Sequence, residues 1–253
     1  MLNNKNLMQY ILGIADNPLI LGQRLGELCG HGPILETDIA MTNIALDLLG
    51  QVRSYFQYVA QLSNDENVTE DAIAFLRNER DYRNVLLVEQ PNIDFAYSIT
   101  RQFLFDVYHL LLLTELQNSE DETLQAIAKK SIKEVTYHVR FSSDWIIRLG
   151  DGTQESNEKM QNAIDDLWTF TDELFHQTDA DIEMVNEGIG VDITKLKGIY
   201  FKKIVEILEQ ATLKIPESKY FQKGGKLGIH SEHMGYLLAD MQYMQRSFPN
   251  MSW

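Results

Sequence analysis

Apolar residues recur every three or four positions along most of the chain, which is the spacing of helices that bury one face. Alternating runs typical of strands are scarce, so the pattern predicts helices almost throughout. The four longest helical stretches are expected at residues 36–62, 69–89, 94–116 and 121–149, with short connections between them. Long helices joined in this way form antiparallel bundles, so an all-α bundle is expected.

Shorter stretches flank these four. The first, at residues 6–15, is expected to stop at Asp16-Asn17-Pro18 and to restart with Pro18, whose fixed φ suits the first position of a helix. The later stretches are a helix at 156–176, a short helix and loop at 179–191, a helix at 195–210, an ordered loop at 214–229 and a helix at 231–247. No break is long enough to be a linker, so residues 1–253 are expected to form one domain with additional C-terminal helices.

The composition narrows the choice of partners. The 253 residues are 44% hydrophobic and 23% charged, which matches an ordinary protein that buries a sizeable core. The formal net charge of −15 would repel both a nucleic-acid backbone and an anionic membrane surface. No apolar run approaches the roughly 20 residues that span a bilayer, and no targeting signal is recognisable. The single cysteine, Cys29, suits a reducing compartment, so a cytoplasmic protein without nucleic-acid or membrane partners is expected.

Each long stretch carries one acid inside an apolar stripe, namely Asp47, Glu79, Asp106 and Glu134. An acid three or four positions from several core residues is expected to point inward. The acids of each successive pair are separated by about one helix plus a turn, as in ferritin-like bundles. Such bundles hold two iron ions with one carboxylate from each of two helices and a Glu-x-x-His pair from each of the other two. The spacing therefore predicts a ferritin-like fold.

The histidines of that metal site are missing at the expected positions. Tyr82 stands three residues after Glu79, and Tyr137 stands three residues after Glu134, so both pairs read Glu-x-x-Tyr. A neutral phenol does not replace an imidazole as an ordinary iron ligand. We therefore expect no metal in this chain and interpret six residues as the remains of a di-iron constellation: Asp47, Glu79, Tyr82, Asp106, Glu134 and Tyr137.

Two histidines keep a metal site open as an alternative. His109 lies three residues after Asp106, and His138 lies four residues after Glu134. With these two as substitute ligands, the chain would be a self-sufficient di-metal oxidase. In a metal-free interior, the acids would instead be compensated by nearby cations such as Arg83 and by the tyrosine hydroxyls. A ferritin-like scaffold protein, or a set of unrelated surface acids, are the remaining interpretations.

Other catalytic patterns are weak. His230 and His233 do not form a zinc-protease motif, because that motif needs histidines four residues apart with Glu directly after the first. They are expected to cap the start of the last helix. The sequence has neither a nucleophile elbow nor a glycine loop of P-loop spacing, so no catalytic or cofactor-binding residue is assigned.

Several longer runs make the chain resemble a known family, the C subunits of ring-1,2-phenylacetyl-CoA epoxidases. The runs are LGQRLGE at 21–27, DIA at 38–40, NIALDLLGQ at 43–51, FLR at 75–77, LLVEQPN at 86–92, RQFLFD at 101–106, KEV at 133–135 with Tyr137 and His138, Trp145, RLGDG at 148–152 and HMGYLLADMQ at 233–242. They cover nearly the whole chain, and the longer runs are specific.

The resemblance implies a ferritin-like fold and a supporting role in phenylacetate catabolism. In this family the di-iron centre lies in a related A subunit, where it uses oxygen and electrons from a reductase to epoxidise the ring of phenylacetyl-CoA. The expected partners are therefore the catalytic, ferritin-like A subunit of the same complex and the other epoxidase subunits, with a homodimer also open. The loss of both Glu-x-x-His pairs agrees with a non-catalytic structural subunit that binds no cofactor itself.

Overall fold

The computed structural model describes residues 4–218, 220–249 and 251, and this part of the chain contains helices and irregular segments but no strand. The α-helices are α1 (Asn4–Leu28), α2 (Leu35–Ser63), α3 (Glu70–Phe75), α4 (Leu86–Glu89), α5 (Phe95–Leu116), α6 (Glu122–Gly150), α7 (Gln154–Leu167), α8 (Asp179–Asn186), α9 (Leu196–Gln210) and α10 (Glu232–Ser247). The 3-10 turns are η1 (Glu79–Asp81), η2 (Trp168–Phe170), η3 (Asp172–Phe175), η4 (Ile193–Lys195) and η5 (Gly225–Leu227).

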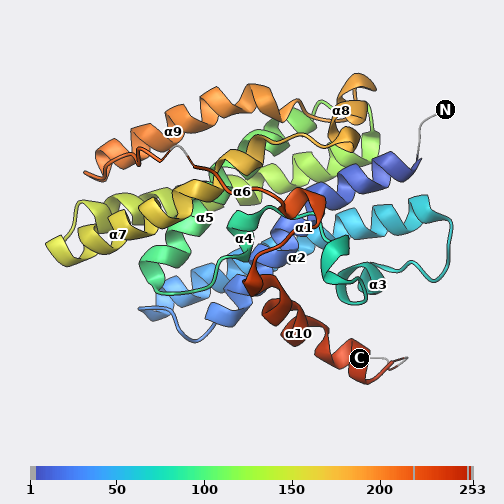
Figure 1. The fold of residues 1–253 in the computed structure, drawn as a ribbon, viewed down its shortest axis with the longest axis horizontal. Helices are drawn as coiled ribbons and strands as arrows, with labels where there is room; N and C mark the ends of the chain where they lie inside the picture. Colours follow the sequence, from blue (N-terminus) through green and yellow to red (C-terminus); the bar gives the residue numbers. More distant parts are fainter. Residues whose placement is uncertain (1–3, 219, 250, 252–253) are drawn as a thin grey trace.

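Four long helices form the central bundle (Figure 1). Helix α1 packs along α2, α5 packs along α6, and α2 also contacts α6, while the short α4 lies between α1 and α5. The apolar side chains that these helices turn toward one another make one continuous core. The expected all-α, ferritin-like bundle is therefore confirmed, with α2, α5 and α6 close to their predicted bounds.

The predicted break at Asp16-Asn17-Pro18 is wrong, because α1 runs without interruption through Pro18. Asp16 and Asn17 do not form a local turn. Their side chains instead accept hydrogen bonds from distant backbone groups, Asp16 from the N–H of Arg83 at 2.8 Å and Asn17 from the N–H of Val85 at 2.8 Å. Tertiary packing on all sides of this turn outweighs the roughly 3 kcal/mol by which proline disfavours a helix interior.

The predicted long helix at 69–89 is also wrong. Helix α3 ends at Phe75, and the chain then passes through η1 and extended residues to the four-residue α4. Asn78 starts η1 with a capping box in which its backbone N–H donates to Asp81 at 2.9 Å. The polar run from residue 77 to 81 interrupts the apolar stripe, so a continuous helix would have no face to bury there. Helix α1 takes the place in the bundle that this stretch was expected to fill.

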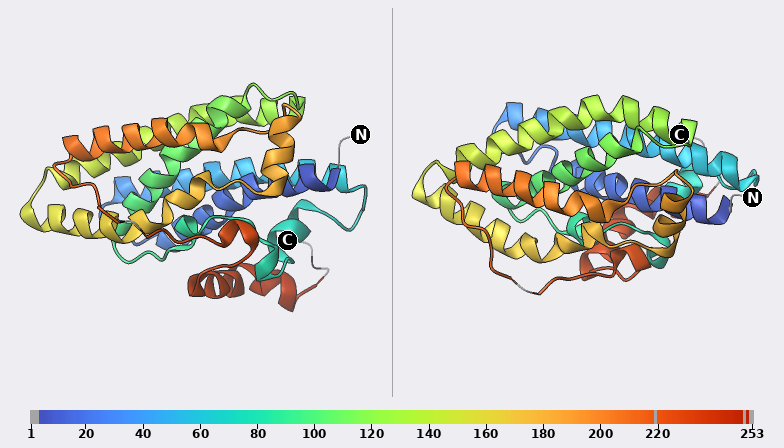
Figure 2. Two further views of the ribbon diagram at one scale, coloured as in Figure 1. Left: turned by 45° about the horizontal axis from the view of Figure 1, so that its top comes forward. Right: turned by 90° about the horizontal axis from the view of Figure 1, so that it is seen from above.

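The helices that follow α6 lie mainly against one side of the bundle (Figure 2). Helices α7 and α9 pack on α5 and α6, α8 packs on α1, and α10 lies across α3, η1 and α1. The stretch predicted as one helix at 156–176 ends earlier, at Leu167, and continues as η2 and η3. The predicted ordered loop at 214–229 contains η5, with residue 219 outside the described part. Within the described ranges, no helix combines the length and the apolar character needed to cross a membrane.

Candidate functional site

Polar side chains from α2, α5 and α6 form a cluster that extends from the bundle core to the α2–α6 contact. Two bridges join α2 to α6. The Oδ2 atom of Asp47 lies 3.0 Å from Nε2 of His138, and Nε2 of Gln51 donates to Glu134 at 2.9 Å. The two bridging residues are four positions apart on each helix. The earlier one on α2 contacts the later one on α6, so α2 and α6 run antiparallel here. Asp47 and Glu134, predicted to point inward, are only partly buried and contact a histidine and an amide at the α2–α6 contact.

Asp106 is the fully buried acid of this cluster. One carboxyl oxygen accepts from Nε2 of Gln102 at 2.6 Å, and the other accepts from Oγ of Ser142 at 2.9 Å. Burial raises the pKa of Asp106 from 3.8 to about 8, although both hydrogen bonds act to lower it. Asp106 is therefore mostly protonated at neutral pH. A half turn of the Gln102 amide would let its oxygen, which otherwise has no partner, accept that proton.

The two histidines of the cluster are neutral at physiological pH. His109 is fully buried, and neither of its ring nitrogens has a hydrogen-bond partner among the described residues. Burial lowers the pKa of His109 to about 3, and nearby His138 lowers it further. Burial also lowers the pKa of His138, against the opposing effect of its hydrogen bond to Asp47. His109 and His138, the alternative metal ligands of the sequence analysis, are both buried in this cluster.

This donor set does not fit a di-iron centre. The two oxygens of Asp106 accept hydrogen bonds from an amide and a serine and do not face a second carboxylate. Asp47 and Glu134 are already bonded across the α2–α6 contact. Among the residues that the structure describes, no group of three or more His, Cys, Asp or Glu side chains is arranged to hold a metal ion. The cluster can cross-link three helices, but it lacks the open carboxylates that iron requires.

Three residues of the predicted constellation lie elsewhere. Glu79 is exposed in η1 and faces α10, so the prediction that it points inward is wrong. Tyr82 is fully buried, but on the α10 side, where its hydroxyl donates to the carbonyl of Ala74 at 2.7 Å and accepts from Gln242 at 2.9 Å. Tyr137 is 48% exposed on the outside of α6, about 100° around the helix from His138. Glu79 and Tyr82 lie elsewhere because the predicted helix at 69–89 is broken. Tyr137 lies outside because it is on a different side of α6 from His138.

Sequence reasoning missed the acid that α1 contributes. Asp16 is fully buried and accepts two hydrogen bonds from the guanidinium of Arg77, at 2.9 and 2.5 Å. That guanidinium also stacks on the ring of Tyr82, with 4.1 Å between its central carbon and the ring centroid. Arg83, predicted to compensate Glu79, instead donates to the carbonyls of Arg80 and Tyr82. The burial of Asp16 could have been predicted from the apolar residues on both sides of it in the sequence. The proline at position 18 predicted a helix break instead, so Asp16 was assigned to a turn.

A second missed acid, Glu89, ties the C-terminal segment to the bundle. It is fully buried and accepts from Asn84, from His230 at 2.5 Å, and from both the N–H and the hydroxyl of Ser231. Burial acts to lower the pKa of His230, but the hydrogen bond and the charge of Glu89 outweigh it and raise that pKa. His230 therefore holds the segment before α10 through Glu89, but the predicted capping role is wrong, because Ser231 is the N-cap residue and no side chain caps the first turn there.

Comparison with known proteins agrees with this fold. The family model described as phenylacetic acid catabolic protein matches residues 2–253. The C subunit of 1,2-phenylacetyl-CoA epoxidase from Escherichia coli (strain K12) is 48% identical over 247 residues, which are 98% of this chain and 99% of that protein. The predicted family resemblance is confirmed. The chain belongs to the phenylacetic acid catabolic protein family.

Proposed function

We propose that this chain is the non-catalytic helical subunit of a multicomponent phenylacetyl-CoA epoxidase, and that the di-iron centre lies in a sister helical subunit. Whole-length similarity to the C subunit of the E. coli epoxidase supports membership in such a complex. The observation that carries the non-catalytic role is the donor set of the bundle interior. Its acids are already bonded to a serine, to amides and to a histidine across the helices, and no group of three or more His, Cys, Asp or Glu among the described residues is arranged to hold a metal ion.

The polar cluster then acts as a structural link. Its bridges hold α2 against α6, while Ser142 connects α6 to Asp106 of α5. These hydrogen bonds would fix the relative positions of α2, α5 and α6, and so the shape of the surface that a neighbouring subunit contacts.

The outer side of α2 and α6 supplies a surface for that neighbour. Because the Asp47–His138 contact joins antiparallel helices, the residue before each of them, Leu46 and Tyr137, points to the same side. Leu46 is 62% exposed, and further apolar side chains extend this α2–α6 face, which consists of Leu35, Ile39, Leu46, Tyr137 and Phe141. Clustered large apolar side chains at a surface are typical of protein interfaces, and obligate interfaces often exceed about 2,000 Å².

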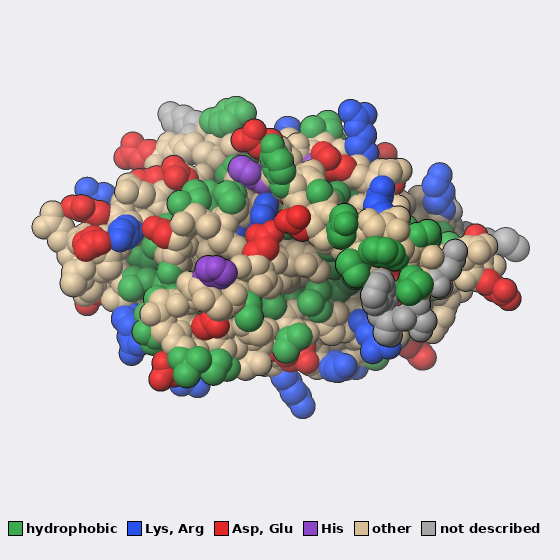
Figure 3. Space-filling model, turned by 90° about the horizontal axis from the view of Figure 1, so that it is seen from below, with side chains coloured by type: hydrophobic (Ala, Val, Ile, Leu, Met, Phe, Trp, Pro, Cys, Tyr) green, Lys and Arg blue, Asp and Glu red, His purple; other side chains and the backbone are tan. Residues whose placement is uncertain are grey.

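Helix α10 carries a second group of exposed apolar side chains, namely Tyr236, Tyr243, Met244 and Phe248. On the underside of the molecule, where α10 lies, apolar groups are interspersed with charged side chains (Figure 3). This more polar surface suits a smaller or transient contact, such as one with another epoxidase subunit. The α2–α6 face, with its exposed apolar side chains on two neighbouring helices, is the better candidate for the catalytic subunit.

Reconstitution tests the role. A mixture of the iron-bearing subunit, the remaining subunits, reductase, NADPH and phenylacetyl-CoA should form epoxide only when this chain is present. Iron measured on the separated chains should follow the sister subunit. Full activity without this chain would contradict the supporting role, and activity with this chain and reductase alone would identify it as a di-metal oxidase.

The interface is tested with a matched pair of variants. Leu46→Asp should weaken co-purification with the catalytic subunit, because a charge would be buried in the contact. Ile182→Asp, at an exposed apolar position on α8 with 47% exposure, should leave co-purification unchanged. Both variants should keep the melting temperature of the isolated chain. Equal binding by Leu46→Asp and the unmodified chain would move the contact away from the α2–α6 face.

A further inference from the structure

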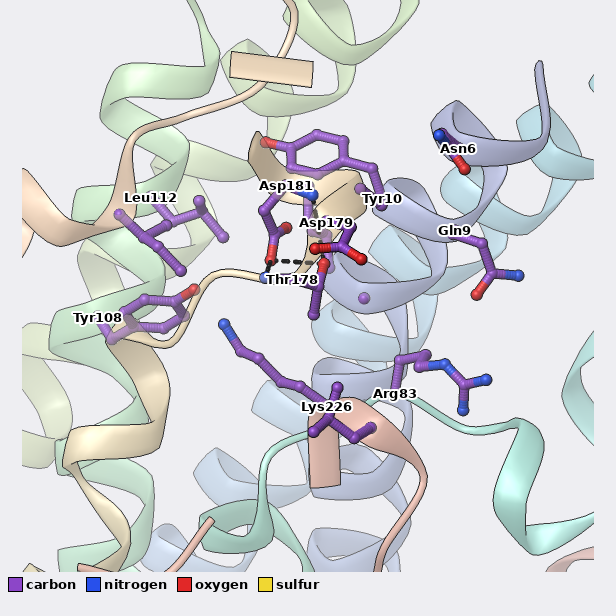
Figure 4. A pocket seen from close by; sticks show the side chains of 15 residues that line it. Asn6, Gln9, Tyr10, Arg83, Tyr108, Leu112, Thr178, Asp179, Asp181 and Lys226 are labelled. Atoms are coloured by element: carbon purple, nitrogen blue, oxygen red, sulfur yellow. Dashed lines mark hydrogen bonds between the residues drawn. The ribbon is translucent and has the colours of Figure 1, made fainter. Parts of the chain in front are cut away.

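A cavity of about 320 Å³ lies away from the polar cluster, between α1, α5, the start of α8 and η5 (Figure 4). Its walls combine the apolar faces of Tyr10, Ile14, Leu112 and Ile193 with a few polar side chains. Ligand cavities begin at about this size, and they usually pair apolar walls with a small number of placed polar groups.

Lys226 is the buried cation of this cavity; Arg83 also belongs to its lining, but Figure 4 shows the Arg83 guanidinium directed away from Lys226 and Tyr108. The Lys226 side chain is 8% exposed, and Figure 4 shows its ammonium pointing into the open space. The ammonium donates to the carbonyls of Leu174 and His176, at 3.3 and 2.8 Å. Within the described residues it has no carboxylate at ion-pair distance, although Asp181 and Glu173 act on it from farther away. Buried charges are normally paired, so an anion brought by a ligand would complete this site.

Tyr108 faces the same space. It is 3% exposed, and its hydroxyl makes no hydrogen bond to any described residue. Its ring is held edge-on by Phe175, with 5.8 Å between centroids, which fixes the direction of the hydroxyl. Figure 4 shows the hydroxyl and the Lys226 ammonium turned toward one region. One charged and one neutral donor that converge in this way can each bind one oxygen of a carboxylate.

The acids at the start of α8 limit the charge of the ligand. Asp181 accepts from the N–H and the hydroxyl of Thr178, at 2.7 and 2.9 Å, in the capping box of α8. Asp179 is exposed at the rim. These two negative charges would repel a phosphate or another multiply charged group. The site therefore favours a singly charged ligand whose remaining atoms are apolar.

We propose that this cavity binds a small monocarboxylate with an apolar or aromatic body. The carboxylate is held by Nζ of Lys226 and the hydroxyl of Tyr108, and the body lies against Ile14 and Leu112. The site needs no residue of the polar cluster and no partner subunit, so it stands apart from the proposed epoxidase role.

Calorimetric titration of the full chain with phenylacetate provides the test. Phenylacetate should bind measurably at millimolar concentration. Phenylacetamide has the same shape without the charge. Its affinity should be lower than that of phenylacetate by a factor of about ten or more. Inorganic phosphate should not compete. Absence of phenylacetate binding, equal binding of the amide, or competition by phosphate would overturn the proposal.

Two variants locate the site. Tyr108→Phe removes a hydroxyl that has no partner among the described residues, so it should keep the melting temperature and weaken phenylacetate binding about fivefold. Lys226→Met should abolish the preference for phenylacetate over phenylacetamide. Lys202→Met, at an exposed lysine of α9, should bind as the unmodified chain does. If Lys226→Met does not fold, Tyr108→Phe decides alone, and unchanged affinity in that variant places phenylacetate elsewhere.

Discussion

Replacing Asp16 by Asn perturbs the contact that holds the irregular segment after α3 against the bundle. Asp16 is fully buried on α1 and receives three hydrogen bonds, two from the guanidinium of Arg77 and one from the N–H of Arg83. Asn keeps the shape of the side chain but removes its charge. The side-chain NH2 group of Asn would also face one of these N–H groups, and two hydrogen-bond donors cannot bond to each other.

The expected loss is large. Removing one partner of a buried ion pair costs about 3 to 5 kcal/mol, because the other charge stays buried and unpaired. Arg77 cannot escape to water easily, since its side chain is 14% exposed and stacked on Tyr82. In chains of this size 1 kcal/mol shifts the melting temperature by about 2 to 4 °C. Asp16→Asn should therefore melt about 6 to 20 °C lower.

Urea and thermal unfolding, followed by circular dichroism, measure this loss. Glu79→Gln is the matched control, because Glu79 is the acid that the sequence pattern placed inside and the structure leaves exposed. It should change the free energy of unfolding by no more than about 0.5 kcal/mol. The double variant Asp16→Asn with Arg77→Met should lose less than the two single losses together, since it leaves no unpaired charge. Strict additivity, or a loss below about 1 kcal/mol for Asp16→Asn, would refute the reasoning.

Three further outcomes follow from the structure. Burial raises the pKa of Asp106 in the folded state to about 8, so the folded protein should lose stability as the pH rises from about 4 towards 8. In Asp106→Asn, the free energy of unfolding measured in urea should no longer fall with pH in this way. Glu89 raises the pKa of His230 in the folded state, so the His230–Glu89 contact contributes its full stability below about pH 6.5. This stability is lost as the pH rises through the folded-state pKa, and over that range the amides of α10 should exchange hydrogen faster. Tyr82→Phe should cost roughly 1 to 3 kcal/mol by leaving two buried partners unpaired, whereas Tyr137→Phe should cost no more than about 0.5 kcal/mol in the same unfolding assay.

Local periodicity determined much of the fold. The apolar repeats predicted α2, α5 and α6 nearly to their ends, because an uninterrupted stripe over more than twenty residues is a strong local signal. The same stripes correctly predicted that Asp106 is buried, whereas Asp47 and Glu134 are only partly buried and Glu79 is exposed. The positions of Tyr82 and Tyr137 in the sequence predicted the loss of the Glu-x-x-His pairs. Both predictions depend only on which side of a helix a residue occupies.

The tertiary structure alone decided which segments meet. Pro18 predicted a helix break that does not occur, and the apolar stripe at 69–89 predicted a helix that does not form. In both cases long-range contacts decided the outcome. Asp16 pairs with Arg77, more than sixty residues away, and α1 occupies the place in the bundle that was predicted for residues 69–89. Glu89 with His230, and Lys226 with Tyr108, likewise come together from distant parts of the chain. Periodicity tells which face of a segment is buried, but it carries no information about the segment that covers that face. The partners of buried charges, and any cavity between distant elements, therefore exist only once the whole chain has packed.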